Sequence, residues 1–384
     1  MKRRTAFRLL SAGAALLFSL LACETGLIAA GYDPMKSLRN GRELFLKPSE
    51  NPDADYELTP GVSGHAWGTG VVVSSAGLRD REFDVDKGRA FRIAVVGDSI
   101  AFGNGMAIDE TFPKRLEGLL RQSGRRAEVM NFAVGGYNAV NYAGALESRV
   151  VRFAPDLVVV GFCVNDVGVD SVNQDYIRAL AWFGRHPLFR LRTVQFIFSR
   201  LQRLEFINEL EAVNSDGEFR SSYRGRILPI AGDRELIGMM SGLRDIDKRT
   251  AGASGGRFFI RWYENPLHIG MTEYAFDKIR NLGRTHSFRV LIVGIPFLSS
   301  EDDALWRQVY RIVAHESAKF GFSYVSPYRR FQRAGLEKLR LTAEDPVHPN
   351  AEGHRLLART ILEFTRRRPK ASTALESGGE PSKK

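Results

Sequence analysis

Short apolar runs alternate with amphipathic stretches over residues 91–366, with one long interruption. Each run has the length of a strand and is apolar at most positions, as in the buried strands of a parallel sheet. The runs cover residues 91–97, 127–134, 156–164, 288–297 and 322–327. This order of elements predicts an α/β fold in which a central parallel sheet lies between two layers of helices.

The stretches between the runs have helical periodicity. In residues 111–124, one helical face carries Phe112, Leu116, Leu119 and Leu120, and Gly124 is a stop signal. Further helical patterns cover residues 138–153, 303–321 and 350–367. Each pattern separates two strands or follows the last one, as βαβ units require.

Polar residues follow the first three runs. Gly97-Asp98-Ser99 ends the first run, Gly135-Gly136 follows the second, and Asn165-Asp166 ends the third. Because ligands bind at the carboxyl ends of parallel strands, we expect these residues to gather at one edge of the sheet.

The sequence also offers partners for Ser99 as a nucleophile. A catalytic serine needs a histidine base, and the base needs a carboxylate to orient it. In one loop, Asp345 can hold Nδ1–H of His348 while Nε2 faces Ser99, and Pro349 keeps His348 extended. By itself, this pair is also compatible with a capping carboxylate and a surface histidine.

An oxyanion formed at Ser99 needs hydrogen-bond donors. The candidates are the backbone N–H of Ser99, a backbone N–H in the Gly135-Gly136 pair, and the side-chain amide of Asn165. Taken singly, each candidate also fits an ordinary turn or a helix cap.

These four blocks, in this order, resemble the SGNH (GDSL-type) hydrolases. "VVGDSIAFG" resembles the nucleophile block with Ser99, and "NFAVGGYN" resembles the second block, with Gly136 as donor. "GFCVNDV" resembles the third block with Asn165, and "DPVHPNAEGH" resembles the last block with Asp345 and His348. The resemblance implies a flavodoxin-like three-layer fold and ester hydrolysis without metal or cofactor. Cys163 departs from the pattern, because many members have glycine there.

The N-terminus has the sequence pattern of an export signal. Lys2, Arg3, Arg4 and Arg8 precede an apolar stretch that extends to about residue 30. This pattern predicts that the following chain lies outside the cytoplasm. The stretch fits an uncleaved membrane anchor, a lipoprotein signal ending at Cys23, or a cleaved signal peptide. "SSAGLRDREF" (residues 74–83) is also similar to a segment of membrane-tethered bacterial SGNH members.

We therefore expect four regions in the chain. They are an anchor or signal over 1–31, a linker and irregular lead-in over 32–90, a hydrolase domain over 91–368 with an insertion at 167–285, and a disordered tail over 369–384. The insertion mixes aromatic and basic residues, and we expect it to shape the acceptor side of the site or to buttress the sheet. The residues in question are Trp182, Phe183, Phe189, Trp262, Arg178, Arg185, Arg190 and Arg261.

Other functional classes fit less well. The net charge of +11 favours contact with anionic lipid or acidic glycan over nucleic acid, because no nucleic-acid-binding motif is present. Ala101 breaks the Gly-x-Ser-x-Gly motif of α/β-hydrolases, and the two cysteines do not form a metal motif. The sequence predicts a serine esterase acting on an acyl ester of an envelope glycan or lipid. An O-acyltransferase and a non-catalytic scaffold are the alternatives.

Overall fold

The computed structural model describes residues 2–32, 45–167, 228–230, 232–249, 257–301 and 303–366, with residues 188, 191–194, 196, 197 and 200 between them. Its centre is a parallel five-stranded sheet with the order β6-β5-β7-β8-β9. The strands are β5 (Phe91–Gly97), β6 (Ala127–Asn131), β7 (Leu157–Phe162), β8 (Arg289–Gly294) and β9 (Ser323–Val325). Numbered within the sheet, this is the 2-1-3-4-5 order of flavodoxin-like folds, so the predicted fold class is confirmed.

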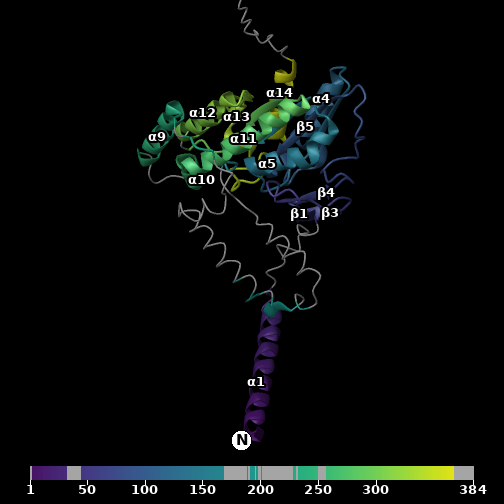
Figure 1. The fold of residues 1–384 in the computed structure, drawn as a ribbon, viewed down its shortest axis with the longest axis vertical. Coiled ribbons are helices and arrows are strands. Elements are labelled where there is room, and N and C mark those ends of the chain that lie inside the picture. The colour runs from purple at the N-terminus through teal and green to yellow at the C-terminus, as the bar shows by residue number, and fades with distance from the viewer. Residues whose placement is uncertain are drawn as a thin grey trace, which may run out of the picture.

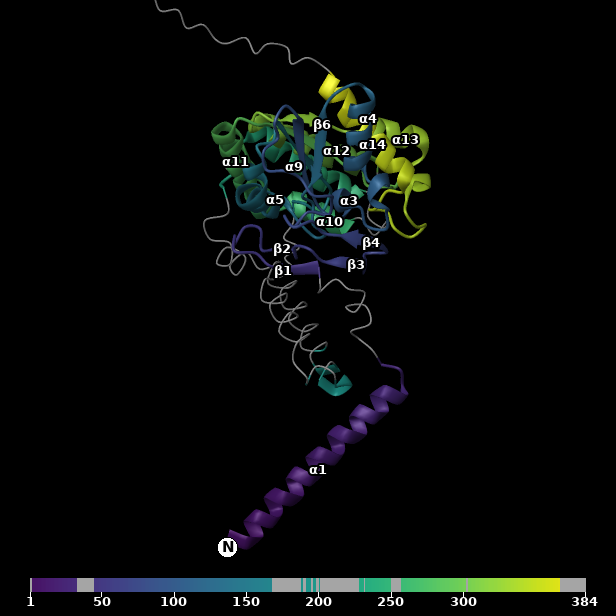
Figure 2. The same cartoon turned by 90° about the vertical axis from the view of Figure 1, so that its right-hand side faces the viewer.

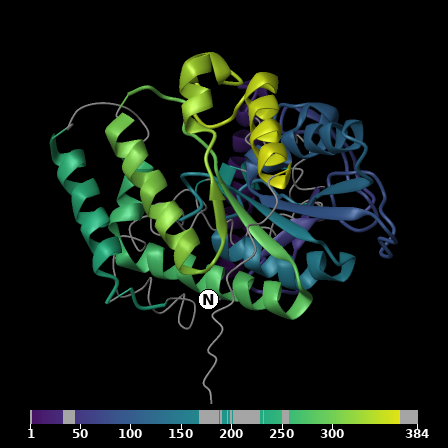
Figure 3. The ribbon, with the colours of Figure 1, turned by 90° about the horizontal axis from the view of Figure 1, so that it is seen from above.

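Helices cover both faces of the sheet (Figure 3). On one face, α4 (Phe112–Gln122) packs against α14 (Ala351–Arg366), and on the other, α5 (Ala139–Ala145) packs against α11 (Pro266–His286). The helix α12 (Asp303–Lys319) connects β8 to β9. The shorter elements are α3 (Ser99–Phe102), η2 (Ile108–Glu110), η3 (Leu146–Val150), η4 (Val151–Phe153), α13 (Tyr328–Ala334) and η6 (Leu336–Leu339).

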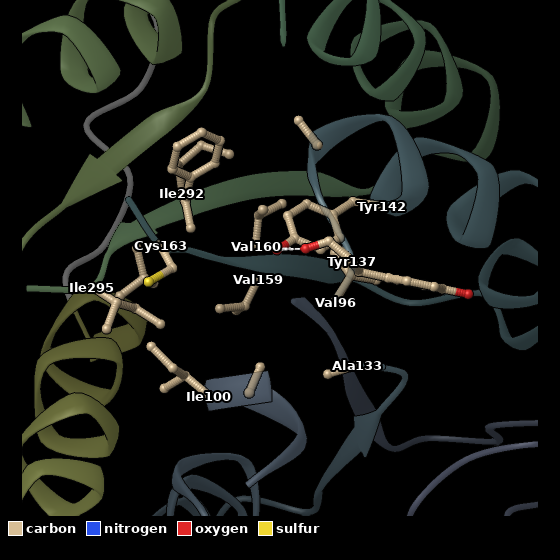
Figure 4. Close-up of a cluster of buried hydrophobic side chains, with 14 of the residues drawn as sticks. Val96, Ile100, Ala133, Tyr137, Tyr142, Val159, Val160, Cys163, Ile292 and Ile295 are labelled. Carbon is tan, nitrogen blue, oxygen red and sulfur yellow. Dashed lines mark hydrogen bonds between the residues drawn. The ribbon is translucent and has the colours of Figure 1, made fainter. Parts of the chain in front are cut away.

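The two central strands are buried almost completely. Every residue of β7 is buried, and in β5 only Phe91 is partly exposed. Figure 4 shows part of this core: Val160 of β7 and Ile292 of β8 lie on one side of the sheet, and Val159 and Ile100 lie on the other. A sheet buried on both faces explains why its strands are continuous apolar runs rather than alternating ones.

The segment before β5 contains two small hairpins. We expected a linker and an irregular lead-in over residues 32–90. In its described part, β1 (Leu46–Pro48) pairs with β2 (Tyr56–Leu58), and β3 (Ser63–Ala66) pairs with β4 (Thr69–Val72). Buried Phe45, Tyr56 and Val71 join the hydrophobic core. Strands of three or four residues among prolines and glycines are too short for a recognisable alternation.

The described part of the region assigned to the insertion includes the helices α9 (Arg234–Arg249), α10 (Arg257–Glu264) and α11. The last of these leads directly into β8, so it is an ordinary crossover helix of the sheet and not part of an added segment. In α10, Trp262 is buried in the core, which fits a buttress. The described residues do not include Trp182, Phe183, Phe189, Arg178, Arg185 and Arg190. The tail predicted over 369–384 also lies outside them.

The N-terminal helix α1 (Lys2–Ala29) extends away from the domain, on the side where β1–β4 lie (Figures 1 and 2). Its stretch Leu10–Ala29 is long and apolar enough to cross a membrane and is not buried against the protein. A helix of this kind near the N-terminus is typical of a membrane anchor or a signal sequence.

Candidate active site

Ser99 lies on a sharp turn between β5 and α3. The strand ends at Gly97, where a Cβ would collide with the side chain of Ala101. Asp98 caps the helix, because its carboxylate accepts a hydrogen bond of 2.9 Å from the backbone N–H of Ile100. Ser99 is therefore the first residue of α3, held at the carboxyl end of the central strand.

The loop before α14 carries Asp345 and His348. The backbone N–H groups of Val347 and His348 donate to one oxygen of Asp345, at 2.9 and 3.0 Å. Across its base, the N–H of Leu341 donates to the carbonyl of His348 at 2.9 Å. The loop thus fixes the carboxylate and the imidazole relative to each other.

The structure brings the three predicted residues into one hydrogen-bonded chain. Nδ1 of His348 lies 2.7 Å from Oδ2 of Asp345, and Nε2 lies 2.8 Å from Oγ of Ser99. Partial burial would raise the pKa of Asp345, but hydrogen bonds from the backbone N–H groups and the neighbouring imidazole outweigh burial and hold that pKa below its usual value. An ionised Asp345 orients His348, so Nε2 can take the proton of Ser99.

The glycine pair lies beside the nucleophile. A Cβ placed on Gly135 would be 3.9 Å from Cβ of Ser99, and Gly136 has φ of +84°, which favours glycine. Within the described part of the chain, no residue accepts a hydrogen bond from the N–H of Gly136. This N–H is therefore free to donate to a ligand.

Asn165 follows β7, the strand paired with β5, and so lies at the same edge of the sheet as Ser99. No described residue hydrogen-bonds its side-chain amide, whose Oδ1 is buried. Cys163, the departure from the family pattern, is itself buried among apolar side chains (Figure 4).

Two buried carboxyl groups beneath the site had no predicted role. Asp98 and Asp166 are almost fully buried, and burial raises the pKa of both, well above the usual value for Asp166. Asp166 accepts a hydrogen bond of 2.6 Å from the backbone N–H of Cys163, which shapes the turn that carries Asn165. Both residues follow the ends of strands, but the sequence does not show which polar residues point inward.

A family model described as the GDSL-like Lipase/Acylhydrolase family matches residues 95–356, a range that contains Ser99, Gly136, Asn165, Asp345 and His348. The chain belongs to this family. The GDSL-like chain is thus a serine ester hydrolase, as the sequence predicts.

This GDSL-like hydrolase is also similar to solved structures at low identity. The crystal structure of TesA matches with a TM-score of 0.40 and 13% identity, over 72% of this chain and 98% of that one. Axe2, an acetylxylan esterase from Geobacillus stearothermophilus, matches with 0.40 and 15%, over 72% and 95%. A two-domain esterase active on acetylated mannans matches with 0.38 and 13%, over 72% and 49%. No curated protein matches the chain.

Proposed function

We propose that this hydrolase is a membrane-anchored serine esterase that cleaves an acyl ester of a cell-envelope glycan or lipid outside the cytoplasm. The hydrogen-bonded chain from Asp345 through His348 to Ser99 is the observation that carries the proposal. The anchor and location are supported by the basic start and the apolar helix α1.

In the first half of the reaction, Oγ of Ser99 attacks the ester carbonyl carbon, and Nε2 of His348 takes the hydroxyl proton. The carbonyl oxygen becomes an oxyanion, which accepts hydrogen bonds from the backbone N–H groups of Ser99 and Gly136 and from the amide of Asn165. The protonated His348 then gives its proton to the leaving alcohol, and the acyl group stays on Ser99.

In the second half, water replaces the alcohol. His348 takes a proton from the water as its oxygen attacks the acyl carbon, and the same donors hold the second oxyanion. When this intermediate collapses, Oγ of Ser99 leaves and recovers the proton from His348, which releases the carboxylic acid. Every step uses only the residues of the chain and water.

The test uses the full-length protein in detergent, with a fluorophosphonate probe and a panel of 4-nitrophenyl esters. We expect wild type to be labelled and active, and Ser99→Ala to lose both labelling and turnover while remaining folded. His348→Ala loses a comparable part of the activity, because the triad acts as a unit. Ser148→Ala, at an exposed position on the continuation of α5, is the matched control and keeps both properties. Turnover by purified Ser99→Ala above the buffer rate would contradict the mechanism.

A further inference from the structure

Asn104 lies beside the nucleophile but has no part in the reaction described above. Its backbone N–H donates to the carbonyl of Ser99 at 3.0 Å, just after α3. Its side chain turns toward the glycine pair, since a Cβ on Gly135 would be 4.0 Å from Oδ1 of Asn104, 3.9 Å from Cβ of Ser99 and 3.7 Å from Nε1 of Trp67. The amide therefore shares the space next to Gly135 with the nucleophile.

The side-chain amide of Asn104 is unpaired. Neither its oxygen nor its nitrogen hydrogen-bonds another described residue, and its Oδ1 is buried. A buried polar atom without a partner is unfavourable, so a ligand that supplies the missing hydrogen bond gains affinity. Half a turn about the last side-chain torsion exchanges oxygen and nitrogen, so either end can face a ligand.

A buried arginine fixes the loop that carries Asn104. The Arg79 side chain is 0% exposed, and its Nη1 donates to the carbonyls of Phe102 and Gly103, both at 2.7 Å. Its Nη2 donates to the carbonyl of Met106 at 2.7 Å. Arg79 comes from the lead-in segment, so that segment holds the loop on both sides of Asn104.

The β3–β4 hairpin holds the same loop from a second direction. The N–H of Gly105 donates to the carbonyl of Trp67 at 2.8 Å, and the hydroxyl of Thr69 donates to the carbonyl of Met106 at 2.8 Å. The Trp67 ring packs edge-on against Phe102, with ring centres 4.8 Å apart. A side chain presented on so fixed a loop is preorganised for recognition.

The chemistry of an amide indicates what it recognises. An oxyanion needs donors only, whereas a primary amide offers a donor and an acceptor. A hydroxyl also donates and accepts, so it can pair with either end of Asn104; an alkyl chain can pair with neither.

We propose that Asn104 binds a free hydroxyl next to the scissile ester. The substrate of the site is then a partly acylated sugar and not a lipid ester without hydroxyls. This proposal rests on the proposed function and restricts its substrate class to sugar esters.

The experiment compares two esters on the full-length protein in detergent. One is a monoacetylated methyl xyloside with its other hydroxyls free, and the second is the same compound with those hydroxyls O-methylated. We expect wild type to have a kcat/KM about tenfold to a hundredfold higher for the first, the usual effect of one buried hydrogen bond. In Asn104→Leu, which has a similar size, the ratio falls close to one. Asn281→Leu, on the exposed side of α11, keeps the wild-type ratio.

Two results would overturn the proposal: a wild-type ratio near one, or an unchanged ratio in Asn104→Leu. If kcat/KM for both esters falls equally while the ratio stays unchanged, Asn104 is a further oxyanion donor instead. If Asn104→Leu does not fold, Asn104→Ser keeps a small hydrogen-bonding group and is expected to give an intermediate ratio. Fluorophosphonate labelling distinguishes failure of this proposal from failure of the proposed function. A wild-type protein that is neither labelled nor active contradicts the proposed function itself.

Discussion

At the residue scale, Asn165 has a role that kinetics can isolate. No described residue hydrogen-bonds its side-chain amide, and Asn165 follows β7 at the edge of the sheet where Ser99 follows β5. We expect Asn165→Ala to lower kcat about 10²–10³-fold on 4-nitrophenyl acetate, because the bond to the oxyanion forms chiefly in the transition state. KM should change little, as steady-state kinetics can show, and Asn281→Ala is the matched control. A change confined to KM would instead assign Asn165 to ground-state binding.

Buried Glu316 leads to a prediction about how the stability of the fold depends on pH. It is 2% exposed on α12, and burial, with neighbouring Glu273, raises its pKa to about 8, although Lys319 acts in the opposite direction. The native state therefore keeps a proton that the unfolded chain loses above about pH 4.5. Stability falls as pH rises from 5 to 8, by on the order of 3 kcal/mol at most.

Glu316→Gln removes this titration and keeps the shape of the side chain. We expect it to raise the melting temperature at pH 8 more than at pH 5, as calorimetry of the full-length protein in detergent at both pH values can show. The exposed Glu50→Gln is the control and changes the pH dependence little. An equal shift at the two pH values would show that Glu316 is not protonated in the folded protein.

At the scale of elements, the lead-in segment docks on α5 through one glycine. A Cβ on Gly144 would overlap the backbone nitrogen of Ala54. Nearby, the Asn141 amide donates to the carbonyl of Asp53 at 3.0 Å, and Lys278 of α11 lies 2.7 Å from the Asp53 carboxylate. This contact holds the segment that fixes the loop after Ser99, so docking and the geometry of the site are linked.

Gly144→Ala tests this docking. We expect it to destabilise the protein by about 1–3 kcal/mol in chemical denaturation, because the added methyl has no room. Gly118→Ala on α4 is the matched control, since nothing lies within 4 Å of its Cβ. There, alanine should be neutral or stabilising by about 0.5–1 kcal/mol. Similar effects at both positions would mean that the segment is not packed on α5 in this way.

At the scale of the whole molecule, we propose that α1 crosses the membrane and anchors the catalytic domain to it. An uncleaved anchor is our prediction, and a lipoprotein signal ending at Cys23, which lies within α1, is the alternative. We expect wild type and Cys23→Ala alike to stay in the membrane fraction, each with the mass of its full, unmodified chain, as fractionation and mass spectrometry of cells expressing each protein can show. Release of Cys23→Ala into the soluble fraction would favour the lipoprotein, and full-length wild type in the cytoplasm would exclude both.

The sequence by itself determined the parts that depend on neighbouring residues. Buried parallel strands need continuous apolar runs, so the β5 segment and the Ser99 turn after it are visible in about ten residues. Asp345 and His348 are three residues apart in one loop, so their mutual geometry is also local.

Only the tertiary structure decided which distant groups meet. Ser99 and His348 are 249 residues apart, and their contact depends on the order of the strands. Trp67 reaches the loop after Ser99 from the turn of a hairpin whose strands have four residues, and Arg79 reaches it from the irregular chain that follows. Neither segment is long enough or regular enough to leave a periodic pattern. Arg79 donates to backbone carbonyls, and the carbonyl of Trp67 accepts from a backbone N–H. Every residue type carries a backbone carbonyl, so no partner residue in the sequence marks these bonds. For the same reason, the unpaired amide of Asn104 becomes visible only when its surroundings are known.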